Sequence, residues 1–362
     1  MFKPKIAITP VITKALMEIE ACRQAITALP LTVSMLDSLR HTARLLSTHY
    51  STQIEGNKLT AAQVKEVVEG GGRFPGRERD EAEVRSYYEA LKFVTEQSKK
   101  NEPLTEKMIR TIHGLVISGR SSPTAYRDGQ NVIKDGRTGG IVYLPPEAKD
   151  VPVLMRDLVT WINVELERND WPVPVIAGLA HYQFATIHPY YDGNGRTARL
   201  LTNLILHRGK YGLHGIYSLE EYYTENLQGY YDALTVGVSH NYYEGRAMAD
   251  VTPFLTYFSV GMADSFAKIR GRAEEAQSKG TPDQTSLLRE LTPQQQKALS
   301  LFAQTKTVAS SDIAKFFKIG TRSASILCRK WVNSGFLLVI DPSKKARRYQ
   351  LTEEYEKLMT AK

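Results

Sequence analysis

The sequence predicts a mainly α-helical protein with one β-hairpin in its middle and a compact module of helices and strands at its C-terminus. Three observations support this fold class. Apolar residues recur every three or four positions over most of residues 12–276, one segment within them is rich in glycine and β-forming residues, and a polar segment at 278–286 precedes the last module. The 362 residues are 42% hydrophobic and 24% charged, which excludes wholesale disorder and suggests two or three domains.

Helices are predicted wherever apolar positions repeat with helical spacing. Such a helix buries a stripe of side chains, so a succession of them predicts a packed helical region. The stretches with this spacing are residues 12–28, 34–54, 60–69, 80–97, 105–117, 151–167, 175–187, 195–207, 218–236 and 253–276.

The helical pattern is interrupted between Tyr126 and Pro146, where the sequence is YRDGQNVIKDGRTGGIVYLPP. An Asp-Gly pair lies between two runs of β-forming residues, NVIK and GIVYL, and this order is a hairpin signal. The Pro-Pro pair after the second run requires an extended exit. We therefore predict a β-hairpin inside the helical region.

A second module follows the polar segment. TPQQQKALSLFA, SSDIAKFFK and TRSASILCRKWVNSG each fit a helix, the second capped by Ser310 or Ser311 and the third ending at Gly335. FLLVID and ARRYQLT then alternate as two strands around a DPSKK turn. Three helices followed by a basic hairpin are typical of a winged helix-turn-helix domain.

The net charge of +8 comes entirely from this C-terminal module. Residues 292–362 hold 13 Lys and Arg against five Asp and Glu, whereas residues 1–291 hold 34 of each sign. A basic appendage on a neutral body suggests a domain that binds duplex DNA. The alternatives are a solvated basic surface and a module for protein docking or dimerisation. The predicted third helix and wing would supply the cations Arg322, Arg329, Lys330, Lys344, Lys345, Arg347 and Arg348.

Composition also bears on the compartment. No apolar run approaches the roughly 20 residues that a membrane helix needs, and the N-terminus lacks the apolar core of a secretion signal. Cys22 and Cys328 lie far apart and match no metal or redox spacing. We therefore expect a cytoplasmic protein without a membrane partner.

The segment from His188 to Arg199, HPYYDGNGRTAR, carries the predicted chemistry. One helix ends before it, a glycine-containing loop follows, and a new helix begins. Gly193 and Gly195 leave space beside the free amides of the new helix, which favours an anion. Arg196 and Arg199 are three residues apart and are expected to project from the first turn toward that anion. Because cations there oppose the helix dipole, a polyphosphate is the ligand that fits best.

Asp192 and His188 complete the predicted site. A carboxylate beside phosphates requires a cation between them, which implies Mg2+ at Asp192. The imidazole of His188 can take a proton from a hydroxyl that attacks phosphorus. GNGRTA also fits the dinucleotide fingerprint, but that motif must follow a strand and here a helix precedes it. A lone histidine or a DGNG turn is more often structural, whereas their combination favours phosphoryl or nucleotidyl transfer.

This segment resembles the signature of Fic (fido) proteins, HPFx(D/E)GN(G/K)RxxR, at every specified position except Tyr190, where the family usually has Phe. The resemblance extends over roughly residues 35–260. It implies a Fic-type helical bundle with the hairpin as its flap, and an enzyme that transfers AMP from ATP to a Ser, Thr or Tyr hydroxyl of a protein. The implied domains are an N-terminal helical region (1–100), the catalytic domain (101–277), a linker (278–290) and the winged-helix domain (291–362).

The resemblance also assigns roles to residues. His188 would be the general base and Asp192 the Mg2+ ligand. Ile141, Val142 and Tyr143 would form the flap edge that clamps the target segment by strand addition. Tyr230 and Tyr231 match a YYxxL element that packs on adenine, although ordinary core tyrosines fit almost as well. The implied ATP-binding residues are Gly193, Asn194, Gly195, Arg196, Thr197, Arg199, Tyr230 and Tyr231, with the two arginines on the outer phosphates.

A second motif, STQIEG from Ser51 to Gly56, resembles the (S/T)xxxE(G/N) inhibitory motif of Fic proteins. Ser51 and Glu55 lie four residues apart on one helical face, and the glycine ends the helix. The carboxylate faces the negative end of the helix dipole, so a compensating cation is expected. By the resemblance, Glu55 pairs with Arg199 and denies it to the γ-phosphate. The protein would then be a self-inhibited, class II member with its inhibitory helix at about 40–56, unless Glu55 is an ordinary surface residue.

Functions of two classes stay open at this point. One is a protein adenylyltransferase, which would bind ATP, Mg2+ and a protein target that could be the chain itself. The other is a DNA-binding transcriptional regulator, using residues 291–362, whose Fic domain senses nucleotide or modifies the protein. In some family members the same glutamate positions a water that removes AMP, so Glu55 is also a candidate hydrolytic residue. Family members often dimerise, which adds a second copy of the chain to the candidate partners.

Overall fold

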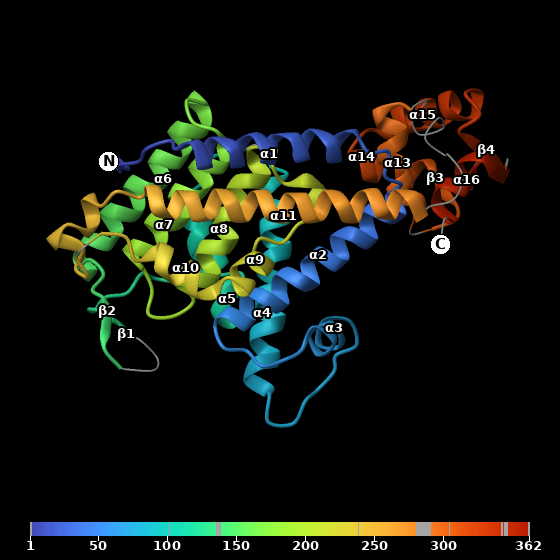
Figure 1. The fold of residues 1–362 in the computed structure, drawn as a ribbon. Coiled ribbons are helices and arrows are strands. Elements are labelled where there is room, and N and C mark those ends of the chain that lie inside the picture. Colours follow the sequence, from blue (N-terminus) through green and yellow to red (C-terminus); the bar gives the residue numbers. More distant parts are fainter. Residues whose placement is uncertain are drawn as a thin grey trace. The chain divides into compact units, whose positions relative to one another are not determined.

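The computed structural model describes residues 2–100, 102–134, 139–237, 239–279, 291–303, 305–341, 343 and 347–360. The chain folds mainly into helices, which confirms the predicted fold class (Figure 1). It forms two compact units, Met1–Thr27 with Arg40–Arg270 and Ala28–Leu39 with Gly271–Lys362. None of the helices in the described ranges is long and apolar enough to cross a membrane.

The helices up to Lys279 follow the predicted stretches closely, with one exception. The stretch at 218–236 was expected to be one helix, but the structure breaks it at Asn226 (φ −123°, ψ 41°). Both the side chain and the amide of Asn226 donate to Tyr222 O (3.1 and 3.0 Å). The helices are α1 (Pro10–Ala28), α2 (Val33–Ile54), α3 (Ala61–Glu69), α4 (Glu78–Ser98), α5 (Glu106–Ser118), α6 (Val151–Arg168), α7 (Val173–Ile187), α8 (Asn194–Arg208), α9 (Glu220–Glu225), α10 (Leu227–Leu234) and α11 (Thr252–Lys279).

The core of the first unit is built around α7 and α8. Nearly every side chain of both helices is buried, and Figure 1 shows the two among the other helices of the unit. Gly178 of α7 allows α11 to pack closely, because a Cβ there would lie 2.8 Å from Phe258 Cδ1. The junction between α7 and α8 is therefore held by a rigid scaffold, which suits a site that must position small groups.

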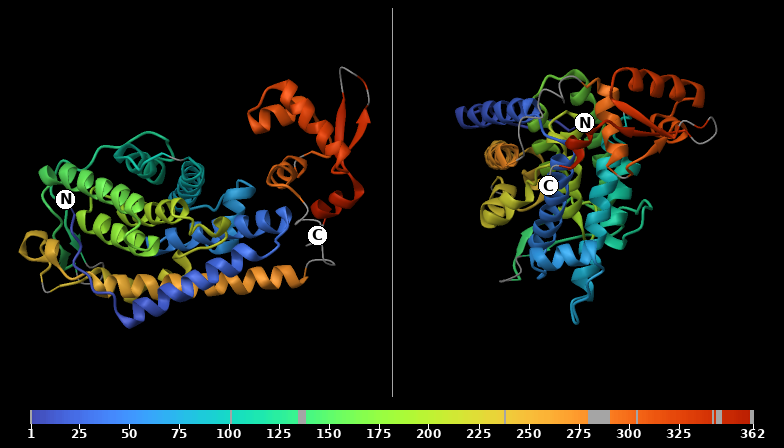
Figure 2. Two further views of the ribbon diagram at one scale, coloured as in Figure 1. Left: turned by 90° about the horizontal axis from the view of Figure 1, so that it is seen from above. Right: turned by 90° about the vertical axis from the view of Figure 1, so that its right-hand side faces the viewer.

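The predicted hairpin is present at one end of the first unit (Figures 1 and 2). Strands β1 (Ile133–Lys134) and β2 (Ile141–Tyr143) pair antiparallel; the loop residues 135–138 lie outside the described part. Beyond β2, Leu144 donates to His240 O (2.7 Å) and accepts from Tyr242 N (3.0 Å). The segment around residues 239–246, for which the sequence suggested no role, thus covers the end of the hairpin, together with the short 3-10 helices η3 (Tyr242–Glu244) and η4 (Arg246–Met248).

The second unit combines helices with a three-stranded antiparallel sheet of order β3-β5-β4 (Figure 2). Trp331, Phe336 and Tyr349 are buried in its core. Its elements are α13 (Pro293–Phe302), β3 (Val308–Ala309), α14 (Ser310–Phe317), α15 (Thr321–Asn333), β4 (Leu337–Asp341), β5 (Arg348–Leu351) and α16 (Glu353–Thr360). The three expected helices and two expected strands are present, whereas β3 and α16 were not expected. The winged-helix assignment stays a prediction.

Two details of the second unit differ from the sequence-based expectation. Neither Ser310 nor Ser311 caps α14; Ala309 is the N-cap residue, and its amide donates to the Asp312 carboxylate (2.8 Å). The predicted linker begins at 278, but α11 continues to Lys279, and residues 280–290 lie outside the described part. Of the predicted wing cations, Lys344 and Lys345 also lie outside it, whereas Arg347 and Arg348 are exposed.

Candidate functional site

The candidate site lies where α7 ends and α8 begins, and His188 is the residue at this junction. Its backbone is left-handed (φ 50°, ψ 60°), and its amide donates to Phe184 O (3.0 Å). This conformation costs a non-glycine residue energy and clusters at functional sites. The imidazole Nδ1 lies 3.3 Å from Ala185 O, which only accepts, so Nδ1 carries the proton and Nε2 keeps its lone pair. Burial lowers the pKa of His188 to about 4, so the ring is neutral at pH 7.

The N-terminus of α8 supplies the amides that the sequence predicts as an anion cradle. The helix begins at Asn194 after Gly193 (φ 76°), and no side chain caps it. Its first-turn N–H groups therefore have no partner within the helix. Asn194 uses its side chain to bind the backbone of Tyr190 twice (3.0 and 2.8 Å), which fixes the loop. A Cβ at Gly195 would lie 2.5 Å from Glu55 Oε1, so the Glu55 carboxylate lies directly over this helix terminus.

Arg199 is buried and is held by the end of α2. Its Nε donates to Ser51 Oγ (2.7 Å), and its Nη2 donates to Ser51 O (2.9 Å) and to Glu55 Oε1 (2.8 Å). The ion pair expected between Glu55 and Arg199 is therefore present. Gly56 ends the helix with φ 93°, a conformation that favours glycine.

Arg196 does not lie beside Arg199 as its spacing suggested. Its Nη1 lies 2.6 Å from Glu83 Oε1 on α4, and its Nη2 lies 3.3 Å from both carboxylate oxygens of Asp192. The two guanidinium groups therefore bind carboxylates of different parts of the chain. Sequence spacing along one helix carries no information about Glu83, which is 113 positions away in the chain.

Asp192 remains a suitable metal ligand. Its side chain is 69% exposed, and Gly193 N donates to one of its oxygens (2.6 Å). In the described part of the chain, no group of three or more His, Cys, Asp or Glu residues could hold a metal ion by itself. One carboxylate beside an anion cradle nevertheless suits Mg2+, which binds through one or two carboxylates together with substrate phosphates and water.

Three of the predicted nucleotide residues differ in burial. Tyr230 is buried and shares a hydrogen bond with His181 Nε2 (2.8 Å), as expected for the alternative of a core tyrosine. Thr197 is completely buried, and its hydroxyl has no hydrogen-bond partner among the described residues. Tyr231 is 45% exposed near the end of α2, and its hydroxyl donates to Ile54 O (3.4 Å). Its adenine role stays a prediction.

Two further residues that sequence reasoning missed fix the loop before α8. His113 of α5 stacks on Tyr190, the ring at the position where Phe is usual, at 3.5 Å and 4°. His113 Nε2 also donates to Asp192 O (2.9 Å). Arg127 is buried, and its Nε donates to His188 O (2.9 Å). Neither residue belongs to a motif, so only their tertiary contacts identify them.

The hairpin residues divide into one that is buried and two that are accessible. Tyr143 is buried, and its hydroxyl donates to Thr186 O (2.8 Å), so its side chain anchors the hairpin to α7 and does not line a docking edge. Ile141 is 54% exposed and Val142 is half-buried. The docking role of these two residues stays a prediction.

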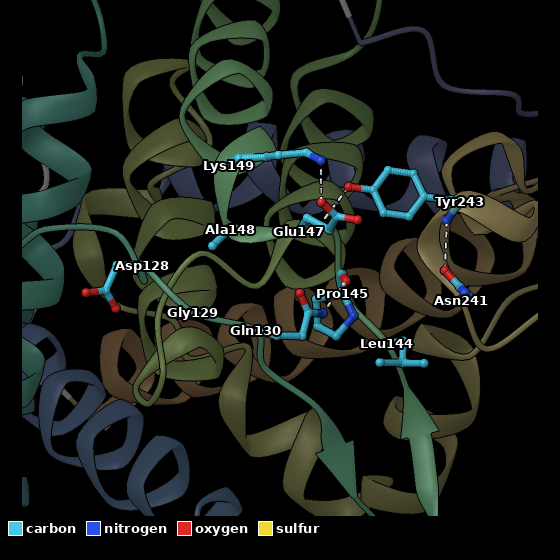
Figure 3. Close-up of a pocket in the computed structure, with 10 residues that line it drawn as sticks. All are labelled: Asp128, Gly129, Gln130, Leu144, Pro145, Glu147, Ala148, Lys149, Asn241 and Tyr243. Atoms are coloured by element: carbon cyan, nitrogen blue, oxygen red, sulfur yellow. Dashed lines mark hydrogen bonds and ion pairs between the residues drawn. The ribbon is translucent and has the colours of Figure 1, made fainter.

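A cavity of about 530 Å³ lies where the chain leaves the hairpin (Figure 3). Figure 3 shows Glu147, Lys149 and Tyr243 on one side and Asp128 across the opening. Arg127 joins the lining of this cavity to the junction of α7 and α8, because its Nη1 donates to Gly129 O (3.0 Å). The cavity is thus connected to His188 through a single guanidinium group.

Comparisons with known proteins agree with this geometry. The Fic/DOC family matches residues 103–206. The protein adenylyltransferase Fic of Drosophila willistoni is 33% identical over 199 residues, which are 55% of this chain and 39% of the fly protein. The chain thus matches about two fifths of the length of such curated relatives.

Solved structures with this fold include a Fic family protein from Desulfovibrio desulfuricans G20, at 24% identity and a TM-score of 0.59, covering 97% of this chain and 99% of that one. Fic-1 from C. elegans has 24% identity and a TM-score of 0.59, covering 74% of each chain. The family match thus assigns a Fic/DOC domain to residues 103–206, and the solved structures show that the chain shares the fold of Fic proteins.

Proposed function

We propose that the chain is a protein adenylyltransferase, which transfers AMP from ATP to a Ser, Thr or Tyr hydroxyl of a protein. The observation that carries the proposal is the uncapped N-terminus of α8, where the glycines leave space for an anion and Glu55 Oε1 fills that space from α2. A helix terminus of this kind binds phosphate groups through its amides and its dipole. The name of the relatives, protein adenylyltransferase Fic, supports the same activity.

The residues of the site have distinct tasks in this reaction. His188 Nε2 accepts the proton of the target hydroxyl as its oxygen attacks the α-phosphorus and the bond to the β-phosphate oxygen breaks, releasing pyrophosphate. The amides of Gly193, Asn194 and Gly195 bind phosphate oxygens, and Arg199 binds the outer phosphate once Glu55 has moved away. Mg2+ on Asp192 would neutralise phosphate charge.

The target segment docks at the hairpin in this proposal. Ile141 and Val142 offer an accessible strand to which an extended segment can add by main-chain hydrogen bonds. The cavity next to Asp128 and Tyr243 supplies further surface for the same segment. Arg127 fixes the distance between this surface and His188, because one guanidinium binds both.

We further propose that the chain inhibits itself through Glu55. The carboxylate fills the space over Gly195 and accepts a hydrogen bond from Arg199. ATP therefore binds productively only after the contact between Glu55 and Arg199 opens. The same carboxylate lies over the amides of α8, where it would activate a water for AMP removal, so this second activity stays in the proposal. Incubation of modified target with the wild-type chain and no ATP tests this: release of AMP supports removal, and stable modification contradicts it.

A test of the transferase itself uses labelled ATP and a cell lysate. Transfer of AMP into protein bands by the Glu55→Gly chain, with none by Glu55→Gly/His188→Ala, supports the proposal. Nucleotide binding without any transfer to lysate proteins or to the chain itself would instead favour a nucleotide sensor. Calorimetry with Mg2+ and ATP distinguishes that outcome from the absence of a nucleotide site.

A second candidate function is DNA binding by the C-terminal unit. Arg322, Arg329 and Lys330 are exposed along α15, and Arg348 is exposed on β5. Fluorescence anisotropy with duplex DNA over a range of salt tests it. We expect each phosphate contact to add about 0.9 to the slope of log K against log salt, so Arg322→Ala and Lys330→Ala flatten it by about one each. Absence of binding at low salt would favour a docking module.

A further inference from the structure

Glu83 of α4 holds Arg196 from the far side of the site. Its Oε1 accepts from Arg196 Nη1 at 2.6 Å, and the two side chains are only 13% and 7% exposed. Water therefore screens this ion pair little. Burial raises the pKa of Glu83, and the positive charge of Arg196 opposes that shift. The ion pair is therefore buried and belongs to the packed interior, not to the solvent-exposed surface.

The same guanidinium also reaches the expected metal ligand. Arg196 Nη2 lies 3.3 Å from each carboxylate oxygen of Asp192. The side chain of Asp192 is 69% exposed, so packing does not fix it. Its carboxylate also accepts a hydrogen bond from the amide of Gly193 (2.6 Å). Arg196 thus links a buried carboxylate to the exposed one that would bind Mg2+.

We propose that Glu83 is a positioning residue that sets the affinity of Asp192 for Mg2+ through Arg196. Glu83 balances the charge of the guanidinium and keeps it in the place from which it orients Asp192. If Glu83 were neutral, a full positive charge would remain beside the carboxylate that must bind a divalent cation. The inference rests on the proposed function, because it assumes a metal–nucleotide complex at this site.

Glu83 also connects this arrangement to the inhibitory segment. Asn57, which follows Gly56, donates its Nδ2 to Glu83 Oε2 (2.9 Å) and to Asp80 O (3.0 Å). The carboxylate that holds Arg196 is therefore tied to the segment whose Glu55 holds Arg199. Opening of that segment removes a hydrogen bond from Glu83 at the same time as it frees the phosphate-binding arginine.

The test measures ATP binding by calorimetry over a range of Mg2+ concentrations. The parent is the full chain with Glu55→Gly and His188→Ala, which binds nucleotide without turnover. We expect Glu83→Gln to raise the Mg2+ concentration for half-maximal ATP binding by about tenfold. ATP binding without metal should not weaken. Glu89→Gln, at an exposed position of the same helix, is the matched control and should behave as the parent.

A second pair of variants guards against unfolding of Glu83→Gln. Arg196→Gln removes the guanidinium, and Glu83→Gln/Arg196→Gln also neutralises the carboxylate that this change leaves unpaired. We expect the same Mg2+ dependence in both variants because Glu83 acts through Arg196. A difference between them would overturn the proposal, as would a Glu83→Gln chain with the Mg2+ dependence of the parent. Absence of ATP binding in the parent would instead overturn the proposed function.

Discussion

Replacement of Glu55 by glycine should raise the rate of AMP transfer by roughly 10- to 150-fold, as the contacts of Arg199 imply. Glu55 Oε1 lies 2.8 Å from Arg199 Nη2, with the two side chains 29% and 1% exposed. Arg199 keeps two bonds to Ser51 (2.7 and 2.9 Å), so the substitution leaves no buried arginine without a partner. A hydrogen bond to a charged group contributes about 1.5–3 kcal/mol, and about 1.4 kcal/mol corresponds to a factor of ten in rate.

The assay is incorporation of labelled AMP into lysate proteins and into the chain itself. Gln53→Gly is the matched control, because Gln53 is exposed in the last turn of α2 and its replacement imposes a similar glycine cost without removing the carboxylate. We expect this control to transfer AMP at the wild-type rate. Equal rates for wild type and Glu55→Gly would refute the reasoning, and so would an equal gain from Gln53→Gly.

Three further predictions concern the proposed base His188, the loop contact of Arg127 and the buried His207. His188→Ala should abolish transfer even without the inhibitory carboxylate, while calorimetry still detects ATP binding. Arg127→Ala removes donors to His188 O, Gly129 O and Pro146 O. It should lower the unfolding free energy, measured by urea unfolding, by about 3 kcal/mol. It should also lower the rate of AMP transfer by about tenfold at unchanged ATP affinity. An unchanged unfolding free energy would contradict the anchoring role. Burial lowers the pKa of His207 to about 4, below its ordinary value of 6.5, so the unfolded chain binds the extra proton first. The contribution of neutral His207 to the unfolding free energy is present above pH 6.5 and is lost on acidification, by about 2 kcal/mol at pH 5. Urea unfolding at pH 7 and pH 5 should show a smaller loss for His207→Leu than for the wild type.

Local patterns in the sequence were sufficient for most of the helices and the hairpin, and the resemblance to Fic proteins supplied the Glu55–Arg199 contact. Helical spacing of apolar residues reports which face is buried, and a glycine such as Gly56 marks where a helix ends. The contact itself followed from the family resemblance and from a carboxylate placed against the helix dipole. The break at Asn226 was not predicted because the apolar spacing continues across it, and only the backbone angles of this residue reveal it.

The partners of the motif could not be predicted from local sequence. Glu83, His113 and Arg127 come from α4, α5 and the segment before the hairpin, and each reaches the site through tertiary packing. For Tyr230 the motif match left an adenine contact and a core tyrosine both open, and only the fold shows that the ring is buried. Spacing along the sequence identifies which residues share a helix turn. The carboxylates that bind Arg196 and Arg199 include Glu83 on α4 and Glu55 just after α2, which lie far away in the sequence.

The left-handed backbone at position 188 lowers the stability of the chain at the residue proposed as the general base. Glycine would adopt φ 50° there without the crowding that a β-carbon causes, so the chain would gain of the order of 1 kcal/mol by giving up its imidazole. A variant library sorted only for resistance to heat should therefore accumulate glycine at this junction and lose the proposed general base. Engineering a hardier version of this protein requires that position 188 be excluded from randomisation.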